Sequence, residues 1–223
     1  MNTLGIAFRN LGRNRRRSFL AILSVFMSMM IVIFADGFIS GVLDSIVRNA
    51  TKNQTGHVNI ATEDYRRRER FMPTNAAIGD ADAVVAAIEA RPELKGLVAQ
   101  VAPRVRFGVV LSSGTATKAA IGIAGESERE RSLLMLDRSV LPGGSYLGAP
   151  GTAIVGSRLA ADLGLKVGDS LKVVAQKADY GLGFKKFRIA GLFRTGMELF
   201  DDSAFQVGID DARELLGLGR GAS

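Results

Sequence analysis

Apolar residues fill one continuous stretch near the start of the chain and alternate with polar residues through most of the remainder. Residues 19–43 carry one ionisable side chain, Asp36, in twenty-five positions. Between residues 19 and 35 only two serines interrupt the run, so a helix there is apolar on all sides. At about 1.5 Å per residue, and with its following turns, this helix can cross a hydrocarbon core roughly 30 Å thick. The pattern predicts a transmembrane helix over residues 19–43.

Basic residues precede this helix, with no acidic residue among them. Residues 1–18 contain five arginines: Arg9, Arg13, Arg15, Arg16 and Arg17. On the far side Asp36 and Asp44 come first, so the positive-inside rule predicts that residues 1–18 are cytoplasmic and that the main domain is outside. Helical spacing of apolar residues within 1–18 predicts an amphipathic segment at the membrane surface. A cleaved signal peptide is the alternative, and it would give a mature chain beginning beyond Ala35.

Apolar residues keep helical spacing past the expected membrane boundary, which predicts a stalk helix over residues 44–55. Val42 and Ile46 belong to this stripe. Gly37 and Gly41 form a small-x-x-x-small pair, a pattern that lets a second helix approach closely. We expect these four positions to pack against a partner helix; the protein's own external domain is the competing partner.

In residues 56–223, apolar residues recur every 2 residues in some segments and every 3.6 residues in others, which predicts an α+β domain. Strands are expected at 56–60, 101–111, 117–124, 153–155, 170–174, 187–193 and the end of 195–207, and helices at 80–91, 157–163 and 210–216. A Ser-Ser-Gly turn is expected to join the second and third strands as an antiparallel hairpin. Glycine and proline at 141–151 predict a boundary between subdomains at about 56–140 and 151–223.

The formal charge of +7 changes this picture little, because the first eighteen residues supply five of those charges. The basicity therefore reflects membrane orientation, and no nucleic-acid partner is expected. The sequence has no cysteine, which excludes disulfides and thiolate metal sites.

Most candidate catalytic and binding residues of the sequence have a structural interpretation. The sequence contains no G-x-x-x-x-G-K-[ST] motif, so any nucleotide hydrolysis is expected in another chain. His57 is the single histidine, and we interpret it as a structural polar contact. Asp201 and Asp202 are adjacent carboxylates that suit a turn beside a strand better than an acid–base pair. No catalytic, cofactor or metal site is expected, and a membrane-tethered hydrolase has no visible nucleophile.

Two segments resemble a known family. One is A-x-R-N-L-x-R-N-R-R-R directly before the membrane helix, at residues 7–17. The other is G-x-x-L-A-x-x-L-G-L-x-V-G-D, whose matching positions include Leu159, Ala160, Leu163, Gly164, Leu165, Val167, Gly168 and Asp169. Together they are similar to permease subunits of the macrolide-exporter and lipoprotein-releasing ABC transporter family, which also includes FtsX-like permeases.

The resemblance implies a first membrane helix, a stalk and a mixed α/β periplasmic core domain in the bacterial inner membrane. It also implies an ATPase subunit dimer, a second permease subunit and a lipoprotein, peptide or amphiphilic substrate. Relatives continue into three further membrane helices, so we expect this chain to be a fragment or a short relative. The alternative function is a membrane-anchored periplasmic binding or scaffold protein without an ATPase.

Overall fold

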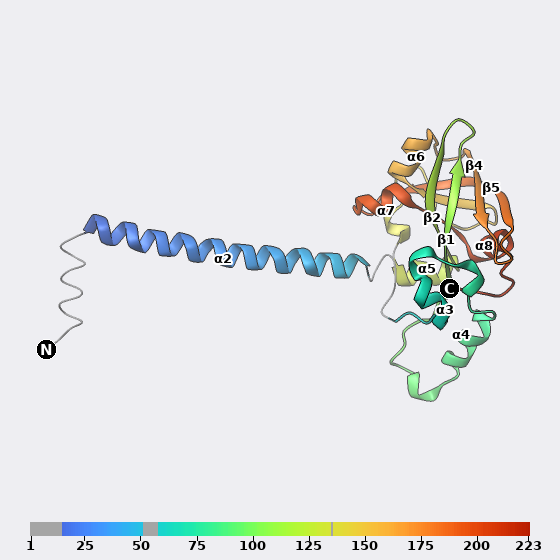
Figure 1. Ribbon diagram of the computed structural model, residues 1–223, viewed down its shortest axis with the longest axis horizontal. Helices are drawn as coiled ribbons and strands as arrows, with labels where there is room; N and C mark the ends of the chain where they lie inside the picture. Colours follow the sequence, from blue (N-terminus) through green and yellow to red (C-terminus); the bar gives the residue numbers. More distant parts are fainter. Residues whose placement is uncertain (1–14, 51–57, 135) are drawn as a thin grey trace. The chain divides into compact units, whose positions relative to one another are not determined.

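The structure, a computed structural model, describes residues 15–50, 58–134 and 136–223, with the backbone alone at 45–50 and 132–134. The chain divides into two compact units, Met1–Ala50 and Thr51–Ser223. We describe each unit by itself (Figure 1).

The first unit contains a single described helix, α2 (Arg15–Ala50), of 36 residues. Its segment Arg15–Asp44 has a mean hydropathy of 2.5 over its most apolar window, and none of that window is buried. Ser24 donates its hydroxyl to the carbonyl of Ala21 at 2.9 Å, and Ser28 donates to Ser24 at 2.8 Å. These hydroxyls therefore have partners within the helix. By its length and hydropathy, α2 can cross a membrane, as predicted for residues 19–43.

The second unit is built on a closed six-stranded barrel. Its strands are β1 (Arg104–Ser112), β2 (Thr117–Gly125), β3 (Thr152–Gly156), β4 (Ser170–Gln176), β5 (Leu182–Phe193) and β6 (Ala204–Gly208). They follow the order β1-β2-β6-β3-β5-β4, and β4 pairs back with β1. The β2–β6 and β3–β5 pairs are parallel and the other pairs antiparallel. The fold class is therefore mixed α/β, as predicted.

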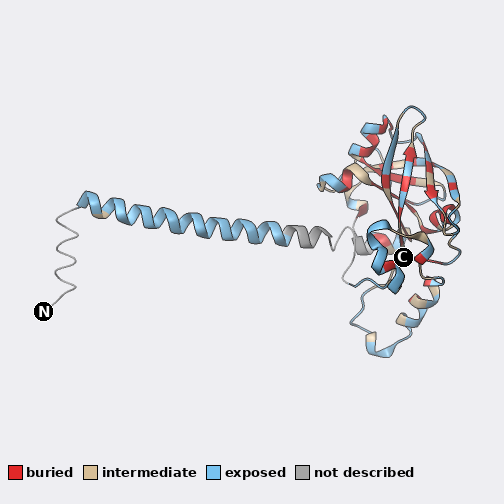
Figure 2. Cartoon of the chain, viewed as in Figure 1, coloured by how far each residue is buried: buried red, intermediate tan, exposed pale blue. Residues whose placement is uncertain are grey.

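Buried residues recur along the strands of the barrel (Figure 2), and their apolar side chains form its core. Phe107, Phe187 and Phe205 are at most 1% exposed, and the rings of Phe107 and Phe205 meet edge to face at 6.1 Å. Gly122 lies opposite Phe107 on β2, where any β-carbon would overlap the phenyl ring. Glycine there leaves space for an aromatic core that fills the small barrel.

Six described α-helices accompany the barrel. They are α3 (Glu63–Arg68), α4 (Ala81–Glu89), α5 (Ser127–Leu134), α6 (Ser157–Leu163), α7 (Glu198–Ser203) and α8 (Ile209–Leu216). Helix α8 contacts five of the six strands and inserts Leu215 and Leu216 into the main core, so it covers one opening of the barrel. Asp80 caps α4 by accepting from the amide of Ala83 at 3.0 Å, at the first residue of the helix predicted over 80–91.

A smaller apolar cluster lies outside the barrel, on the other face of β2, β3, β5 and β6. Its buried members are Ile123, Leu136, Leu147, Ile154, Phe193, Phe200 and Ala204. Phe200 comes from α7, and Leu136 and Leu147 come from the connection that precedes β3. This cluster holds α7 and the connection against the sheet.

Two expectations about the second unit do not match the structure. Residues 58–60 form no strand, and Val58 is 82% exposed; a closed barrel offers these residues no free edge for pairing. The loop at 141–151, expected as a subdomain boundary, connects strands of one barrel. The main core joins Phe107 from one side of that loop to Leu171 from the other.

Candidate functional site

The residues of the L-A-x-x-L-G-L motif form the helix α6 and its C-terminal turn. Leu159, Ala160 and Leu163 are at most 1% exposed and belong to the main core. Gly164 ends the helix in the left-handed conformation, with φ 67°, and its amide bonds the carbonyl of Ala161 at 3.0 Å. This glycine cap avoids the steric cost of a side chain at positive φ.

The V-G-D part of the motif turns the chain into β4. Asp169 accepts the amide of Lys166 at 2.8 Å, and the Gly168 amide donates to Ile189 on β5 at 2.8 Å. Leu165 is buried and Val167 is 40% exposed. The motif therefore sets the position of α6 and β4 on the barrel, and its apolar members other than Val167 are core residues.

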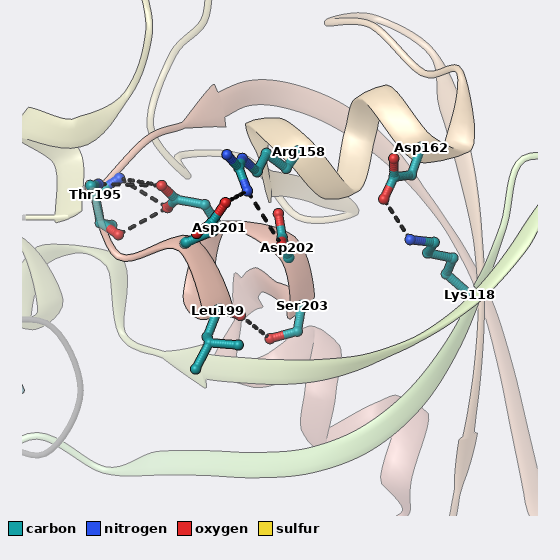
Figure 3. A network of polar contacts seen from close by, with 10 residues as sticks. Lys118, Arg158, Asp162, Thr195, Leu199, Asp201, Asp202 and Ser203 are labelled. Carbon is teal, nitrogen blue, oxygen red and sulfur yellow. Dashed lines mark hydrogen bonds and ion pairs between the residues drawn. The ribbon is translucent and has the colours of Figure 1, made fainter.

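Helix α7 packs beside α6, and its buried carboxylate Asp201 binds the loop that precedes it (Figure 3). Asp201 is 4% exposed and accepts from the amide and hydroxyl of Thr195 at 2.9 and 2.8 Å, and from the amide of Gly196 at 3.2 Å. Gly156 at the end of β3 lies so close to the Asp201 carbonyl that a β-carbon there would overlap it. These donors satisfy the carboxylate, so Asp201 organises the loop before α7.

The surface of α6 and α7 carries ion pairs (Figure 3). Arg158 of α6 pairs with Glu198 and, at 3.7 Å, with Asp202 of α7. Lys118 of β2 pairs with Asp162 of α6 at 2.5 Å. Leu199 lies on the same helix as Asp202 and is 86% exposed. The turn predicted at Asp201 and Asp202 is wrong, because both residues lie within the six-residue helix α7. The hydrogen bonds of Asp201 and the ion pairs of Arg158 hold this helix in place.

A buried ion pair joins α5 to β1. Glu130 is fully buried, and both of its oxygens accept from the Arg104 guanidinium, at 3.0 and 2.7 Å. Tyr146 lies near this pair and donates to Gln206 at 3.3 Å. Burial, reinforced by the charge of Glu130, raises the pKa of the Tyr146 phenol well above its ordinary value, so the hydroxyl stays protonated. These groups stabilise the packing of α5 on the barrel.

The described residues show no arrangement typical of catalysis. No group of three or more His, Asp and Glu side chains among them is placed to hold a metal ion. An open pocket of about 530 Å³ lies beside α8 and includes Asp82, Arg213 and Arg220. Arg213 there is bound by Asp82 at 2.8 Å and by the Gly221 carbonyl at 3.2 Å, so its guanidinium supports local structure.

The expected helix-packing positions lie on the exposed surface of α2. A β-carbon at Gly37 or Gly41 would meet no atom within 4 Å, and Val42 is 42% exposed. The side chain of Ile46 lies outside the described residues.

Of the orientation arginines, Arg15, Arg16 and Arg17 begin α2 and are exposed. Arg9 and Arg13, the amphipathic segment and His57 lie outside the described residues, as does the stalk beyond Ala50.

In the described chain, a helix long and apolar enough to cross a membrane precedes a barrel domain. The sequence matches a family described as the MacB-like periplasmic core domain over residues 18–221, a range that includes most of each unit. The chain belongs to this family, whose members are permease components of ABC-type transporters.

A solved structure also resembles the chain: the extracellular domain of the noncanonical ABC-type transporter YknZ from Gram-positive bacteria. The alignment has 16% identity and a TM-score of 0.44, and it covers 61% of this chain and 73% of the other. No curated protein matches the sequence.

Sequence reasoning did not find the buried pair of Arg104 and Glu130 or the role of Asp201. Glu130 lies in the polar run S-E-R-E-R, where nothing distinguishes it from its exposed neighbour Glu128. All six strands lack aspartate and glutamate, and four of them carry lysine or arginine, a signal that is visible in the sequence.

Proposed function

We propose that this chain is a permease component of an exporter in the bacterial inner membrane. It couples ATP hydrolysis by a separate ATPase dimer to movement of a lipoprotein, peptide or amphiphilic substrate on the periplasmic side. The observation that carries the proposal is the family match, because one match includes the apolar helix and the barrel domain.

The proposed mechanism is mechanical. Residues 1–18 are cytoplasmic, residues 19–43 cross the membrane, residues 44–55 form a stalk and residues 56–223 form the periplasmic core domain. The described helix α2 runs without interruption from Arg15 to Ala50, past the end of the predicted span. A continuous helix transmits displacement along its length, whereas a flexible tether does not, and Gly37 and Gly41 are its weakest positions.

The test measures whether the external domain moves with the nucleotide state. The chain has no cysteine, so Thr115→Cys at the exposed tip of the β1–β2 hairpin gives one spin-label site. The labelled chain is assembled with its ATPase and partner permease in nanodiscs. We expect the distance between labels on the two permeases to change between the nucleotide-free and vanadate-trapped states.

The control uses an ATPase whose catalytic glutamate is replaced by glutamine, with vanadate and ADP in place of ATP. That sample should keep the nucleotide-free distance. An unchanged distance in the active complex would overturn the mechanical proposal and favour a membrane-anchored binding or scaffold protein.

A further inference from the structure

Four strands of the barrel carry basic side chains and no acidic ones. β1, β2, β4 and β5 contain seven lysines and arginines and neither aspartate nor glutamate. Three of the seven pair with carboxylates of helices: Arg104 with Glu130, Lys118 with Asp162, and Lys185 with Asp211. In the part of the chain that the structure describes, the other four form no ion pair; they are Arg106, Lys172, Lys186 and Arg188.

An apolar row crosses the outer face of these strands. Phe184 lies opposite Val174, Val174 opposite Val110, and Val110 opposite Ala119. Phe184 is 71% exposed and Val110 is 43% exposed. Because neighbouring strands are about 4.8 Å apart, the four side chains form a continuous row about 14 Å long.

Three of the unpaired cations lie along one side of this row. Lys186 is directly opposite Lys172, and Arg188 lies one row further on, opposite Ser170. Like charges placed directly opposite each other on a sheet destabilise it. A ligand that brings carboxylates to Lys172 and Lys186 removes this repulsion, so the charge pattern favours an anionic occupant.

The geometry excludes three simpler occupants. A second copy using the same face would bring cations against cations. A closed barrel has no free strand edge, so a partner cannot bind by adding a strand. Against a bilayer, the row offers little apolar surface to bury, because Phe184 is its one large and mostly exposed side chain.

We propose that the row Phe184–Val174–Val110–Ala119 and the cations Lys172, Lys186 and Arg188 form a docking surface for an acidic amphipathic helix of another protein. About nine residues of helix span 14 Å and place apolar residues at i, i+3 or i+4, and i+7 on the row. Acidic residues on one flank of that helix then meet the cations. This surface goes beyond the proposed export function and does not depend on it.

The test uses a stapled helical peptide with leucines at i, i+4 and i+7 and glutamates along one flank. The full chain in phosphatidylcholine nanodiscs carries an environment-sensitive dye on Ala119→Cys, at the end of the row. We expect saturable binding with a blue shift of the dye. Phe184→Ser and the pair Lys172→Glu with Lys186→Glu should each weaken binding about tenfold, which corresponds to about 1.4 kcal/mol.

Matched control variants carry the same changes elsewhere on the surface. Leu199→Ser removes an equally exposed apolar residue, and Arg91→Glu with Lys95→Glu reverses two exposed charges beside α4. These variants should bind like the wild type. A peptide with lysines in place of the glutamates should bind the charge-reversed pair better than the wild type.

The proposal is overturned if the acidic peptide gives no saturable shift, or if the controls weaken binding as much as the changes on the row. A shift produced by phosphatidylglycerol vesicles without peptide, and lost in the charge-reversed pair, would assign the surface to the membrane instead.

Discussion

Asp201 and Asp202 are adjacent in the chain but have different surroundings. Asp201 is 4% exposed and accepts from Thr195 and Gly196, whereas the Asp202 side chain is 40% exposed and lies 3.7 Å from Arg158. A buried carboxylate held by backbone amides contributes more to stability than an exposed ion pair. The sequence did not distinguish them, because burial here depends on the approach of β3, which lies more than forty residues earlier.

This difference in burial predicts that the same substitution at the two positions lowers the free energy of unfolding by different amounts. Asp201→Asn places an amide NH₂ against backbone donors and should lower the free energy of unfolding by about 2 kcal/mol. Asp202→Asn should change it by less than about 0.5 kcal/mol. Pulse proteolysis of the full chain across a urea gradient measures both values; equal midpoints would refute the structural role of Asp201.

Elements defined by neighbouring residues could be predicted from the sequence. Helix α6 begins and ends where its pattern and Gly164 placed it, and the β1–β2 hairpin and the Asp80 cap follow local turn and capping chemistry. The order of strands in the barrel could not be predicted. The β2–β6 and β3–β5 pairs join segments distant in sequence, and no local periodicity specifies which segments pair.

Helix α2 supports a prediction about assembly. Gly37 and Gly41 lie on one face, and a β-carbon at either position meets no atom within 4 Å. Gly37→Leu with Gly41→Leu should therefore leave α2 helical but block close approach of a partner helix. A tag on this chain, used to isolate the complex from native membranes, should recover much less of the second permease.

Ala35→Leu is the control for this change, because residue 35 lies on the opposite side of the helix from residues 37 and 41. It should leave recovery of the second permease unaltered. Equal recovery with the glycine variants would show that another face of α2, or another element, makes the contact.

For the whole molecule, charge and hydropathy together predict on which side of the membrane each end of the chain lies. Chains with a single cysteine at Asn10 or at Thr115 are expressed in cells whose outer membrane is permeable. A membrane-impermeant maleimide should label Thr115→Cys in intact cells and label Asn10→Cys only after the inner membrane is opened. Labelling of both positions in intact cells would contradict the single-span orientation.

Closure of the barrel also governs when the domain can fold. β2 ends at Gly125, but its neighbour β6 begins at Ala204, and β1 pairs with β4 from Ser170 onward. During synthesis the chain therefore leaves the translocation channel with its early hairpin unable to complete a core until β6 and α8, which ends at Leu216, have crossed. Through that interval the apolar faces of β1 and β2 are exposed to proteases and to aggregation. The protein should consequently depend on extracytoplasmic chaperones while it is being secreted, even though the finished barrel has no open edge.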